Sequence, residues 1–340
     1  HARTAAGRAA GVEVRAGTAV RILTGAPLTA GADAVVPVED TDAPMGAAAL
    51  PDRVAIYDSR PPGAHVRRAG SDLRRDHPLL ASGAVMTPAA MAVAAAGGHA
   101  DLLVHARPRV AILATGNELA PIGKELGEDE IPDSNSVGLS AQGREAGAEV
   151  RSFGIARDEL DDVVDHLRRA LEWANVVVVS GGVSVGAHDV VKDAFDSVGK
   201  VELWRIAVQP GKPLAFARAE KALLFGLPGN PVSSFVTFEL FVRPVLRRLA
   251  GHADVIGRET VTARLGEDVS KSPNRRAFLR VRLESASEAN PPGSGLVARL
   301  AGGQDSHVLS ALAAADGLAI IPEEDDALPA GSEVEVMRLR

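Results

Sequence analysis

Between residues 108 and 250, short apolar runs alternate with helical patterns, and this alternation limits the folds open to the chain. RVAILATG (109–116) and NVVVVSGG (175–182) show no polar residue at every second position, and an amphipathic stretch (159–174) lies between them. Strands that are apolar on both faces and separated by helices are typical of a parallel sheet covered on both sides. We therefore predict an α/β domain over 108–250. Its expected strands are 109–116, 148–156, 175–182 and 222–229, and its expected helices are 136–147, 159–174, 189–199 and 230–251.

The flanking regions have a different pattern. Residues 1–66 and 251–340 carry short β patterns broken by turns, which predict two β domains. Residues 67–107 contain one helical stretch, with Thr87 as its cap and Pro88 in its first turn, and form a small mixed segment. The predicted fold class is α/β plus β, a multidomain chain whose central parallel-sheet domain lies between two β domains.

Composition excludes several classes of function. The net charge is −7, which argues against a general nucleic-acid binder because such a protein must neutralise phosphates. The chain has no cysteine, so disulfides, thiolate nucleophiles and Cys-ligated zinc are excluded. It also has neither an apolar run of about 18 residues nor the apolar core of a signal peptide, so we expect no membrane partner and a cytoplasmic location.

Four loops at strand ends are candidates for binding chemistry. They are TGNEL (115–119), SGGVSVGAHD (180–189), VQPGKPL (208–214) and GLPGNPVSS (226–234). One glycine-rich turn is usually a plain connector, but four at one sheet edge would supply backbone N–H groups, Lys212 and Asp189. Such a set suits an anion with a divalent cation. The chain lacks the G-x-G-x-x-G dinucleotide fingerprint, and QPGKPL has proline where a Walker A loop needs Ser or Thr.

These loops, together with GTAVRILTGAPLTAGADAVVPVED, VRRAGSD and SNS, resemble the molybdopterin molybdenumtransferases, the MoeA family that includes the E domains of gephyrin and Cnx1. The resemblance implies an α/β domain shared with molybdopterin adenylyltransferases, and a homodimer. It also implies that molybdate is inserted into the dithiolene of adenylylated molybdopterin, with release of AMP and help from Mg²⁺.

The resemblance and the chemistry together assign candidate roles. Asp189 would hold Mg²⁺ or cap the helix after it, and Lys212 would bring positive charge to molybdate or a phosphate. Glu118 is a candidate site carboxylate, and Asp158 is either an acidic site residue or a helix N-cap. Thr24 and Asp72 would close the site from the partner subunit or cap turns.

Other positions are expected to bind substrate. Asn135 and Ser136 would bond the nucleotide or cap a helix, and an arginine and a serine from Arg275, Arg280 and Ser306 would lie near the oxyanion, unless the arginines belong to a solvated strand face. Arg205 keeps a charge where relatives often have lysine, whereas Gln209 loses one. The remaining candidates are Gly116, Ser180, Gly181, Gly182, Ser184, Gly186, Gly211, Pro213, Pro228, Gly229, Asn230, Pro231 and Ser233.

Two alternatives remain open at this point. The chain could be a molybdopterin adenylyltransferase, although those enzymes are usually single compact domains, or a non-catalytic scaffold like the gephyrin E domain. An adenylyltransferase could also be a partner that hands over substrate. The family's N-terminal motif, of the form N-S-A-M-D-G-Y-A, is absent and the chain starts at His1, so we expect an upstream segment to be missing.

Overall fold

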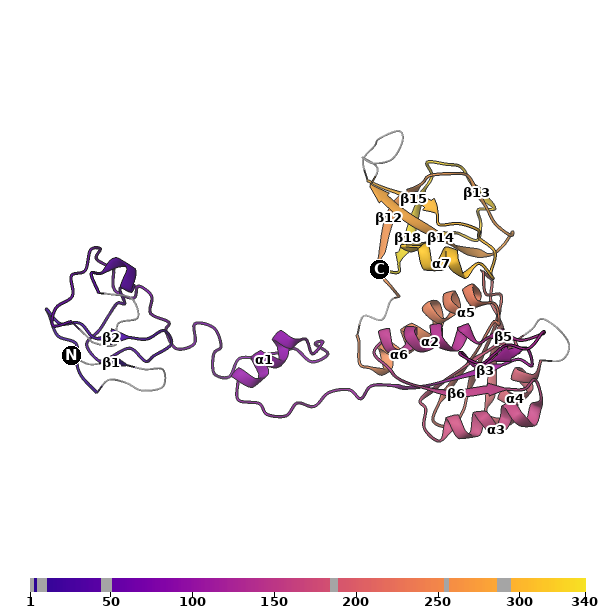
Figure 1. Cartoon of the computed structure of the whole chain (residues 1–340), viewed down its shortest axis with the longest axis horizontal. Helices are drawn as coiled ribbons and strands as arrows, with labels where there is room; N and C mark the ends of the chain where they lie inside the picture. The colour runs from indigo at the N-terminus through magenta and orange to yellow at the C-terminus, as the bar shows by residue number, and fades with distance from the viewer. Residues whose placement is uncertain (1–2, 5–10, 44–50, 184–188, 254–256, 286–294) are drawn as a thin grey trace. The chain divides into compact units, whose positions relative to one another are not determined.

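The computed structural model describes residues 3–4, 11–43, 51–183, 189–253, 257–285 and 295–340. The chain divides into two compact units (Figure 1). Unit 1 comprises residues 1–81 and 86–100, and unit 2 comprises residues 82–85 and 101–340. The division into four domains expected from the sequence stays a prediction.

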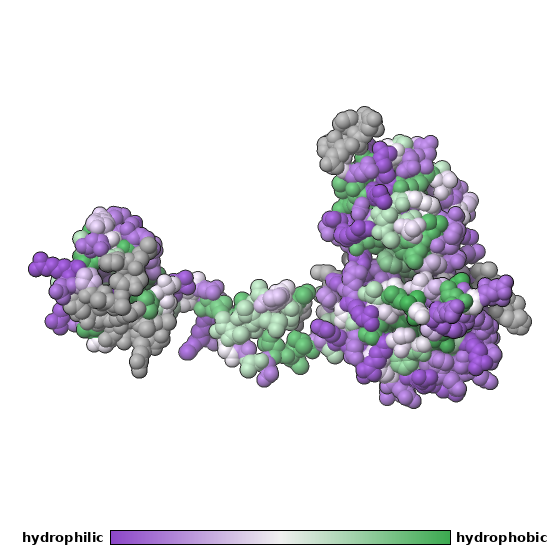
Figure 2. All heavy atoms as spheres, viewed as in Figure 1, coloured by the Kyte–Doolittle hydropathy of each residue, from purple (hydrophilic) through white to green (hydrophobic). Residues whose placement is uncertain are grey.

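Unit 1 has little regular structure in its described residues. Strands β1 (Arg3–Thr4) and β2 (Arg21–Ile22) form a short parallel pair, and Val38–Asp40 is a 3-10 turn, η1. The predicted helix is present as α1 (Pro88–Ala96), and the Thr87 hydroxyl accepts a hydrogen bond from the Ala90 amide as its cap. The α1 sequence is apolar on all sides, and Figure 2 shows apolar residues gathered over it. Of the short β patterns expected over 1–66, the described residues form β1, β2 and one bridge, between Thr41 and Ile56.

The centre of unit 2 is a six-stranded sheet in the order β6-β3-β7-β11-β10-β8. Its first four strands are parallel, as predicted, whereas β10 and β8 add an antiparallel edge that the sequence pattern did not indicate. The strands are β3 (Arg109–Thr115), β6 (Glu149–Ala156), β7 (Val176–Ser180), β8 (Lys200–Arg205), β10 (Pro213–Arg218) and β11 (Leu223–Leu227).

Helices cover both faces of this sheet (Figure 1), which explains the continuous apolar runs. Ala111, Leu113, Val177 and Val179 face α3 and α4, while the alternate residues of the same strands face α2, η2 and α6. The helices are α2 (Ser134–Glu145), α3 (Leu160–Leu171), α4 (Val190–Val198), α5 (Pro231–Thr237), the π-helical turn η2 (Phe238–Val242) and α6 (Arg243–Leu249). A short pair, β4 (Leu119–Ala120) and β5 (Ile131–Pro132), projects from the end of β3.

The C-terminal part of unit 2 is a closed five-stranded sheet. Its strands pair in the order β15-β12-β18-β16-β14, and β14 also pairs with β15, so the ring closes around an apolar core. The strands are β12 (Thr260–Leu265), β14 (Arg276–Ser285), β15 (Leu296–Leu300), β16 (Gly317–Ile321) and β18 (Glu333–Arg338). Around them lie β13 (Val269–Ser270), β17 (Ala327–Leu328) and α7 (Leu309–Ala314). The stretch ANPPGSG (289–295), whose composition predicts a hairpin tip or loop, lies outside the described residues except for Gly295.

Strand pairing and apolar packing both join the α/β part of unit 2 to the closed sheet. Strand β9 (Val208–Gln209), which precedes β10, pairs in parallel with the start of β14. Apolar side chains of α5, including Val232 and Val236, pack against Phe278, Leu312 and Leu318. The loop between β9 and β10 therefore lies where the two parts meet. The fold class predicted from the sequence is confirmed by structures of relatives, described below.

Candidate functional site

The predicted binding loops come together at one edge of the α/β sheet. Gly116 follows β3, Gly181 follows β7 and Pro228 follows β11, so three loops leave the carboxyl ends of parallel strands. The loop containing Gly211 and Lys212 precedes β10, and it reaches the same edge because β10 runs antiparallel to β11. The common edge was expected. The fourth loop lies at this edge because β10 is antiparallel to β11, which the sequence did not indicate.

A chain of short hydrogen bonds ties the loops after β7 and β11 to the start of α2. The side-chain nitrogen of Asn135, Nδ2, donates to the Ser180 hydroxyl at 2.9 Å and to the Gly229 carbonyl at 2.7 Å. Ser180 Oγ lies 3.2 Å from Ser234 Oγ, which in turn donates to the Pro228 carbonyl at 2.9 Å. Ser234 was not singled out from the sequence, because its motif was assigned to neighbouring residues. The network fixes the loops relative to one another before any ligand is considered.

Gly181 and Gly182 occupy positions that a side chain could not. Both have positive φ, 94° and 65°, and a Cβ on Gly181 would lie 2.3 Å from the Thr115 carbonyl oxygen. A Cβ on Gly182 would lie 2.6 Å from Thr115 Oγ1. The end of β7 thus packs directly against the end of β3, and the missing side chains allow this close approach. Ser184 and Gly186, from the same motif, lie outside the described residues.

Asp189 begins helix α4. Its carboxylate accepts a hydrogen bond from the Lys192 amide at 3.1 Å, so the capping role that the sequence allowed is present, and the residue is 5% exposed. Among the described residues, no group of three or more His, Cys, Asp or Glu side chains could hold a metal ion. A carboxylate oxygen such as those of Asp189 is a type of ligand that Mg²⁺ accepts.

The other predicted carboxylates lie around the first strand end. Glu118 is exposed and its carboxylate lies close to Gly116, since a Cβ on that glycine would be 2.7 Å from Oε2. Asp158 is exposed, and its amide donates to the Asn117 side chain at 3.3 Å. The N-cap of α3 is Glu159, so of the two alternatives for Asp158 the N-cap is not met, and its role as an acidic site residue stays a prediction.

A pocket of about 330 Å³ lies between the α/β part and the closed sheet of unit 2. Lys212, Pro213 and Ser233 line it from one side, and Arg275 and Ser306 line it from the other. Its other lining residues are Val208, Gln209, Pro210, Gly211, Ser272, Gln304 and Asp305. The structure therefore brings together four of the predicted residues, Lys212, Ser233, Arg275 and Ser306, which lie up to 94 positions apart in the chain.

The walls of this pocket are held by direct hydrogen bonds. Asn230 Nδ2 donates to Ser306 Oγ at 2.9 Å, and the Val232 amide donates to the Ser306 carbonyl at 3.1 Å. Gln209 Oε1 accepts from the Ser272 amide at 2.9 Å. Gln209, which brings no charge, thus has a structural bond across the two parts. Pro231 lies in the first turn of α5, where its fixed φ suits the helix start.

Arg280 does not line the pocket. It is fully buried, and its Nη2 donates to the carbonyls of Gly303 and Asp305 at 3.0 and 3.1 Å. Burial lowers the pKa of its guanidinium below the usual value, and the charge of Asp305 opposes that shift. The side chain of Gln304 completes the support by bonding both the amide and the carbonyl of Arg280. Arg280 therefore supports the loop that carries Ser306, a role that the sequence did not indicate.

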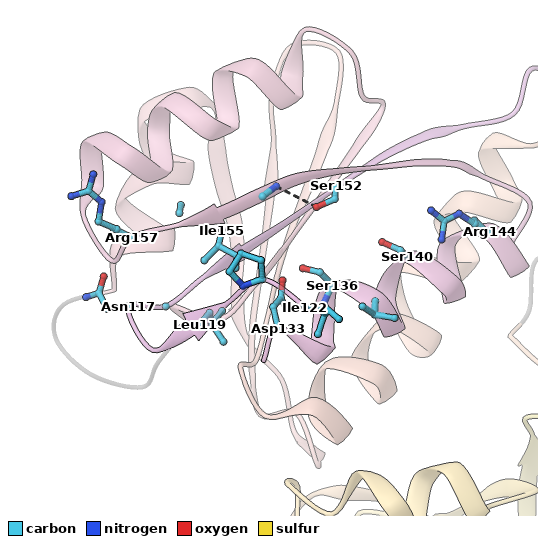
Figure 3. Close-up of a pocket in the computed structure, with 15 residues that line it drawn as sticks. Asn117, Leu119, Ile122, Asp133, Ser136, Ser140, Arg144, Ser152, Ile155 and Arg157 are labelled. Atoms are coloured by element: carbon cyan, nitrogen blue, oxygen red, sulfur yellow. Dashed lines mark hydrogen bonds between the residues drawn. The ribbon is translucent and has the colours of Figure 1, made fainter. Parts of the chain in front are cut away.

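A second, larger pocket of about 740 Å³ begins at Gly116 and Asn117 and runs along α2. Figure 3 shows Ser136, Ser140 and Arg144 projecting from α2 toward it, opposite Ser152 and Ile155 of β6. Asp133 caps α2 by accepting from the Ser136 amide, so the capping predicted for the SNS motif belongs to the residue before it. The Ser136 hydroxyl is buried and has no hydrogen-bond partner among the described residues.

The remaining predicted residues are placed as follows. Arg205 is exposed at the end of β8, at the same sheet edge, opposite Pro213. Thr24 and Asp72 are exposed residues of unit 1. No helix in the described part of the chain is both long and apolar enough to cross a membrane.

Comparisons with known proteins agree with this architecture. Three family models match: "MoeA N-terminal region (domain I and II)" over residues 1–98, "Probable molybdopterin binding domain" over 111–248, and "MoeA C-terminal region (domain IV)" over 262–339. Molybdopterin molybdenumtransferase 2 of Mycobacterium tuberculosis is 39% identical over 98% of this chain and 80% of its own length. The corresponding enzyme of Haemophilus influenzae is 31% identical over 94% of this chain and 76% of its own length.

A solved structure of a molybdopterin biosynthesis MoeA protein from Pyrococcus horikoshii has a TM-score of 0.79 and 32% identity, and covers 99% of this chain and 80% of that one. The resemblance inferred from the motifs is thereby confirmed. The match of three family models, the relatives' identities and the structural similarity all agree. The chain belongs to the molybdopterin molybdenumtransferase family.

Proposed function

We propose that the chain inserts molybdate into the dithiolene of adenylylated molybdopterin with release of AMP, and that molybdate binds in the 330 Å³ pocket. Membership of the family makes the chain a transferase of molybdenum cofactor biosynthesis. The observation that carries the finer proposal is the convergence of Lys212, Ser233, Arg275 and Ser306 on one small pocket.

The chemistry of the lining suits a tetrahedral dianion. Lys212 and Arg275 bring two positive charges, and the planar fork of an arginine can donate two parallel N–H bonds to oxygen atoms. The serine hydroxyls can donate to the remaining oxygens. Asp305 also lines the pocket, and its carbonyl is engaged by Arg280.

The organic substrate would lie along the strand edge beside this pocket. Gly182 is half-buried and Gly229 exposed, so their backbones would approach phosphate oxygens, whereas the Gly116 and Gly181 amides donate to the Ala156 and Leu227 carbonyls. Asp189 would give a carboxylate oxygen to Mg²⁺. When bound, Mg²⁺ would polarise the phosphoanhydride for cleavage. Glu118 and Asp158 would lie near the other end of the edge, and the larger pocket offers room of the size that small-molecule sites have. The homodimer, closure by Thr24 and Asp72, and substrate transfer from an adenylyltransferase belong to the same proposal.

The pocket is tested by molybdate binding, measured by calorimetry on the full chain. Lys212→Ala and Arg275→Ala should each weaken molybdate binding by about tenfold or more, since a charged hydrogen bond is worth about 1.5–3 kcal/mol. Arg276→Ala is the matched control, because Arg276 is adjacent in sequence but pairs with Glu323 outside the pocket. Equal effects of Arg275→Ala and Arg276→Ala, or none, would contradict the assignment.

The reaction is tested by AMP release from adenylylated molybdopterin with molybdate and Mg²⁺. Asp189→Asn keeps a good N-cap, so loss of AMP release with unchanged folding would support a metal-binding role. Pyrophosphate release from ATP and molybdopterin, without molybdate-dependent AMP release, would favour the adenylyltransferase. Binding of nucleotide with neither reaction would favour a scaffold.

A further inference from the structure

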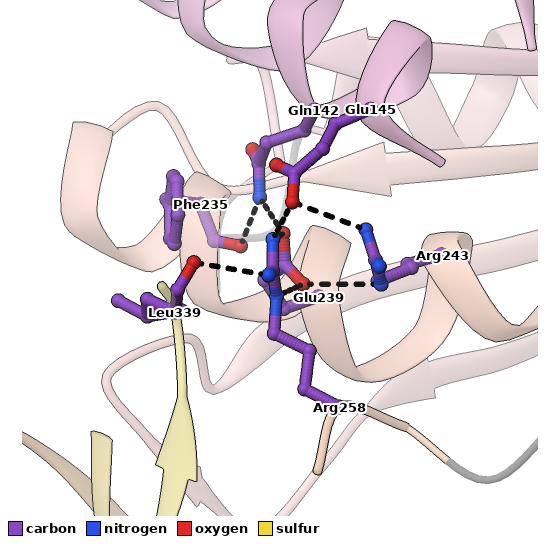
Figure 4. A network of polar contacts seen from close by, with 7 residues as sticks. All are labelled: Gln142, Glu145, Phe235, Glu239, Arg243, Arg258 and Leu339. Carbon is purple, nitrogen blue, oxygen red and sulfur yellow. Dashed lines mark hydrogen bonds and ion pairs between the residues drawn. The ribbon is translucent and has the colours of Figure 1, made fainter. Parts of the chain in front are cut away.

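The turn η2 places a carboxylate in the interior of unit 2. The Glu239 side chain is fully buried, and its oxygens accept from Arg258 Nε at 2.7 Å and from Gln142 Nε2 at 2.7 Å (Figure 4). Arg243 approaches the same carboxylate at 3.7 Å. A buried charge is retained only where such partners replace its lost hydration.

Arg258 connects three separate parts of unit 2. Besides Glu239, its guanidinium donates to Glu145 at the end of α2, at 2.8 Å, and to the Leu339 carbonyl after β18, at 3.1 Å. Burial by itself would lower the pKa of Arg258, but its bonds to Glu239 and Glu145 outweigh burial and the pKa is raised. Arg258 therefore remains charged and holds the last strand of the closed sheet to the helical layer.

Helix α5 is consequently attached to the closed sheet at both ends. At its start, Asn230 and Val232 bond to Ser306, and just beyond its end Glu239 connects through Arg258 to Leu339. Between these two points the contact is made by apolar side chains, which are not directional. Ser233, which lines the molybdate pocket, lies between the two attachments.

We propose that Glu239 and Arg258 are positioning residues that set the α5 wall of the 330 Å³ pocket against its Ser306 wall. The inference rests on the proposed binding of molybdate in that pocket. Directional bonds at both ends of α5 prevent the helix from pivoting on its apolar contact, so the spacing between Ser233 and Ser306 is held before the oxyanion arrives. Neither residue lines the pocket, so their effect is indirect.

The test replaces the pair with apolar residues of similar volume, Glu239→Leu with Arg258→Met, in the full chain. Replacing both partners removes the two closely paired charges together, Arg243 keeps its ion pair with Glu145, and such replacements often preserve stability. We expect molybdate affinity to fall by about tenfold, a change of about 1.4 kcal/mol, while nucleotide affinity changes by less than about twofold. The single variant Arg258→Lys keeps the charge but loses the planar fork of the guanidinium. Its molybdate affinity should therefore lie between those of the double variant and the wild type.

Hydrogen exchange at the Val232 amide gives a readout independent of molybdate. This amide donates to the Ser306 carbonyl, so its protection should fall in the double variant. A folded double variant with wild-type molybdate affinity and wild-type protection of Val232 would overturn the proposal. Lys212→Ala in the molybdate-binding assay separates the pocket assignment from the attachment of α5. If Lys212→Ala leaves molybdate binding unchanged, the pocket assignment fails. Loss of Val232 protection in the double variant would still report the attachment.

Discussion

Gly181→Ala would force a side chain into the backbone of a neighbouring strand. Gly181 has φ of 94°, and its added Cβ would lie 2.3 Å from the Thr115 carbonyl oxygen. Because that atom belongs to buried strand β3, it cannot move aside as a flexible side chain could. The loop after β7 would have to shift by about 1 Å to restore ordinary contact, which disturbs a close-packed interior.

The expected cost combines two contributions. Overpacking typically costs about 1–3 kcal/mol, and the left-handed backbone costs about 1–2 kcal/mol for a residue with Cβ. Alanine also restricts the unfolded chain, which returns about 0.4–1 kcal/mol. We therefore expect the free energy of unfolding to fall by about 2–4 kcal/mol.

Two other glycines separate these contributions. Gly147 has φ of 90° but open space around its Cβ position, so Gly147→Ala should cost only the backbone part, about 1 kcal/mol. Gly229 lacks positive φ and its Cβ would meet only the Gly181 Cα, at 3.6 Å, so Gly229→Ala should change stability by less than about 0.5 kcal/mol. The chain's two tryptophans, Trp173 and Trp204, are both in the α/β part, so urea unfolding followed by fluorescence reports on this region. If Gly181→Ala costs no more than Gly147→Ala, the close approach of β7 to β3 is refuted.

Three further substitutions test the packing of unit 2, each by urea unfolding. Phe195→Ala should destabilise by about 3–5 kcal/mol, because Phe195 of α4 is fully buried in the apolar core. A loss below about 1 kcal/mol would contradict that packing. Asn135→Ala removes two bonds between loops and should cost about 1–3 kcal/mol; an unchanged midpoint would show that the bonds are not formed in solution. Arg280→Met leaves two loop carbonyls without their donor, so we expect a loss of about 1–3 kcal/mol and weaker molybdate binding measured by calorimetry, whereas weaker binding at full stability would mean that Arg280 contacts the oxyanion directly.

The helices and the parallel strands could be predicted because their signals are local. Thr87 and Pro88 marked the start of α1, and the apolar runs marked β3 and β7. Strands β8 and β10 were missed. The turn joining β10 to β11 is closed by the Ala219 amide and the Ala222 carbonyl and contains no glycine, proline or asparagine, so nothing in the sequence announced a hairpin.

The candidate site was predictable in its members but not in their grouping. Lys212, Ser233, Arg275 and Ser306 were each singled out, yet only the packing of α5 on the closed sheet shows that they line one pocket. Arg280 was assigned with Arg275 because the two arginines are close in sequence, but Arg275 precedes β14 and lines the pocket, whereas Arg280 lies within β14 and is fully buried.

The sequence by itself determined the α/β character of residues 108–250, the turn-forming glycines and the family resemblance, because periodicity, capping and motif order are properties of neighbouring residues. Tertiary structure alone decided the antiparallel edge of the sheet, the closure of the C-terminal strands into a ring and the Glu239–Arg258 attachment. These features depend on contacts between residues far apart in the chain. A glutamate in a helical pattern looks like any solvated residue until its partner, 19 positions later, is folded against it.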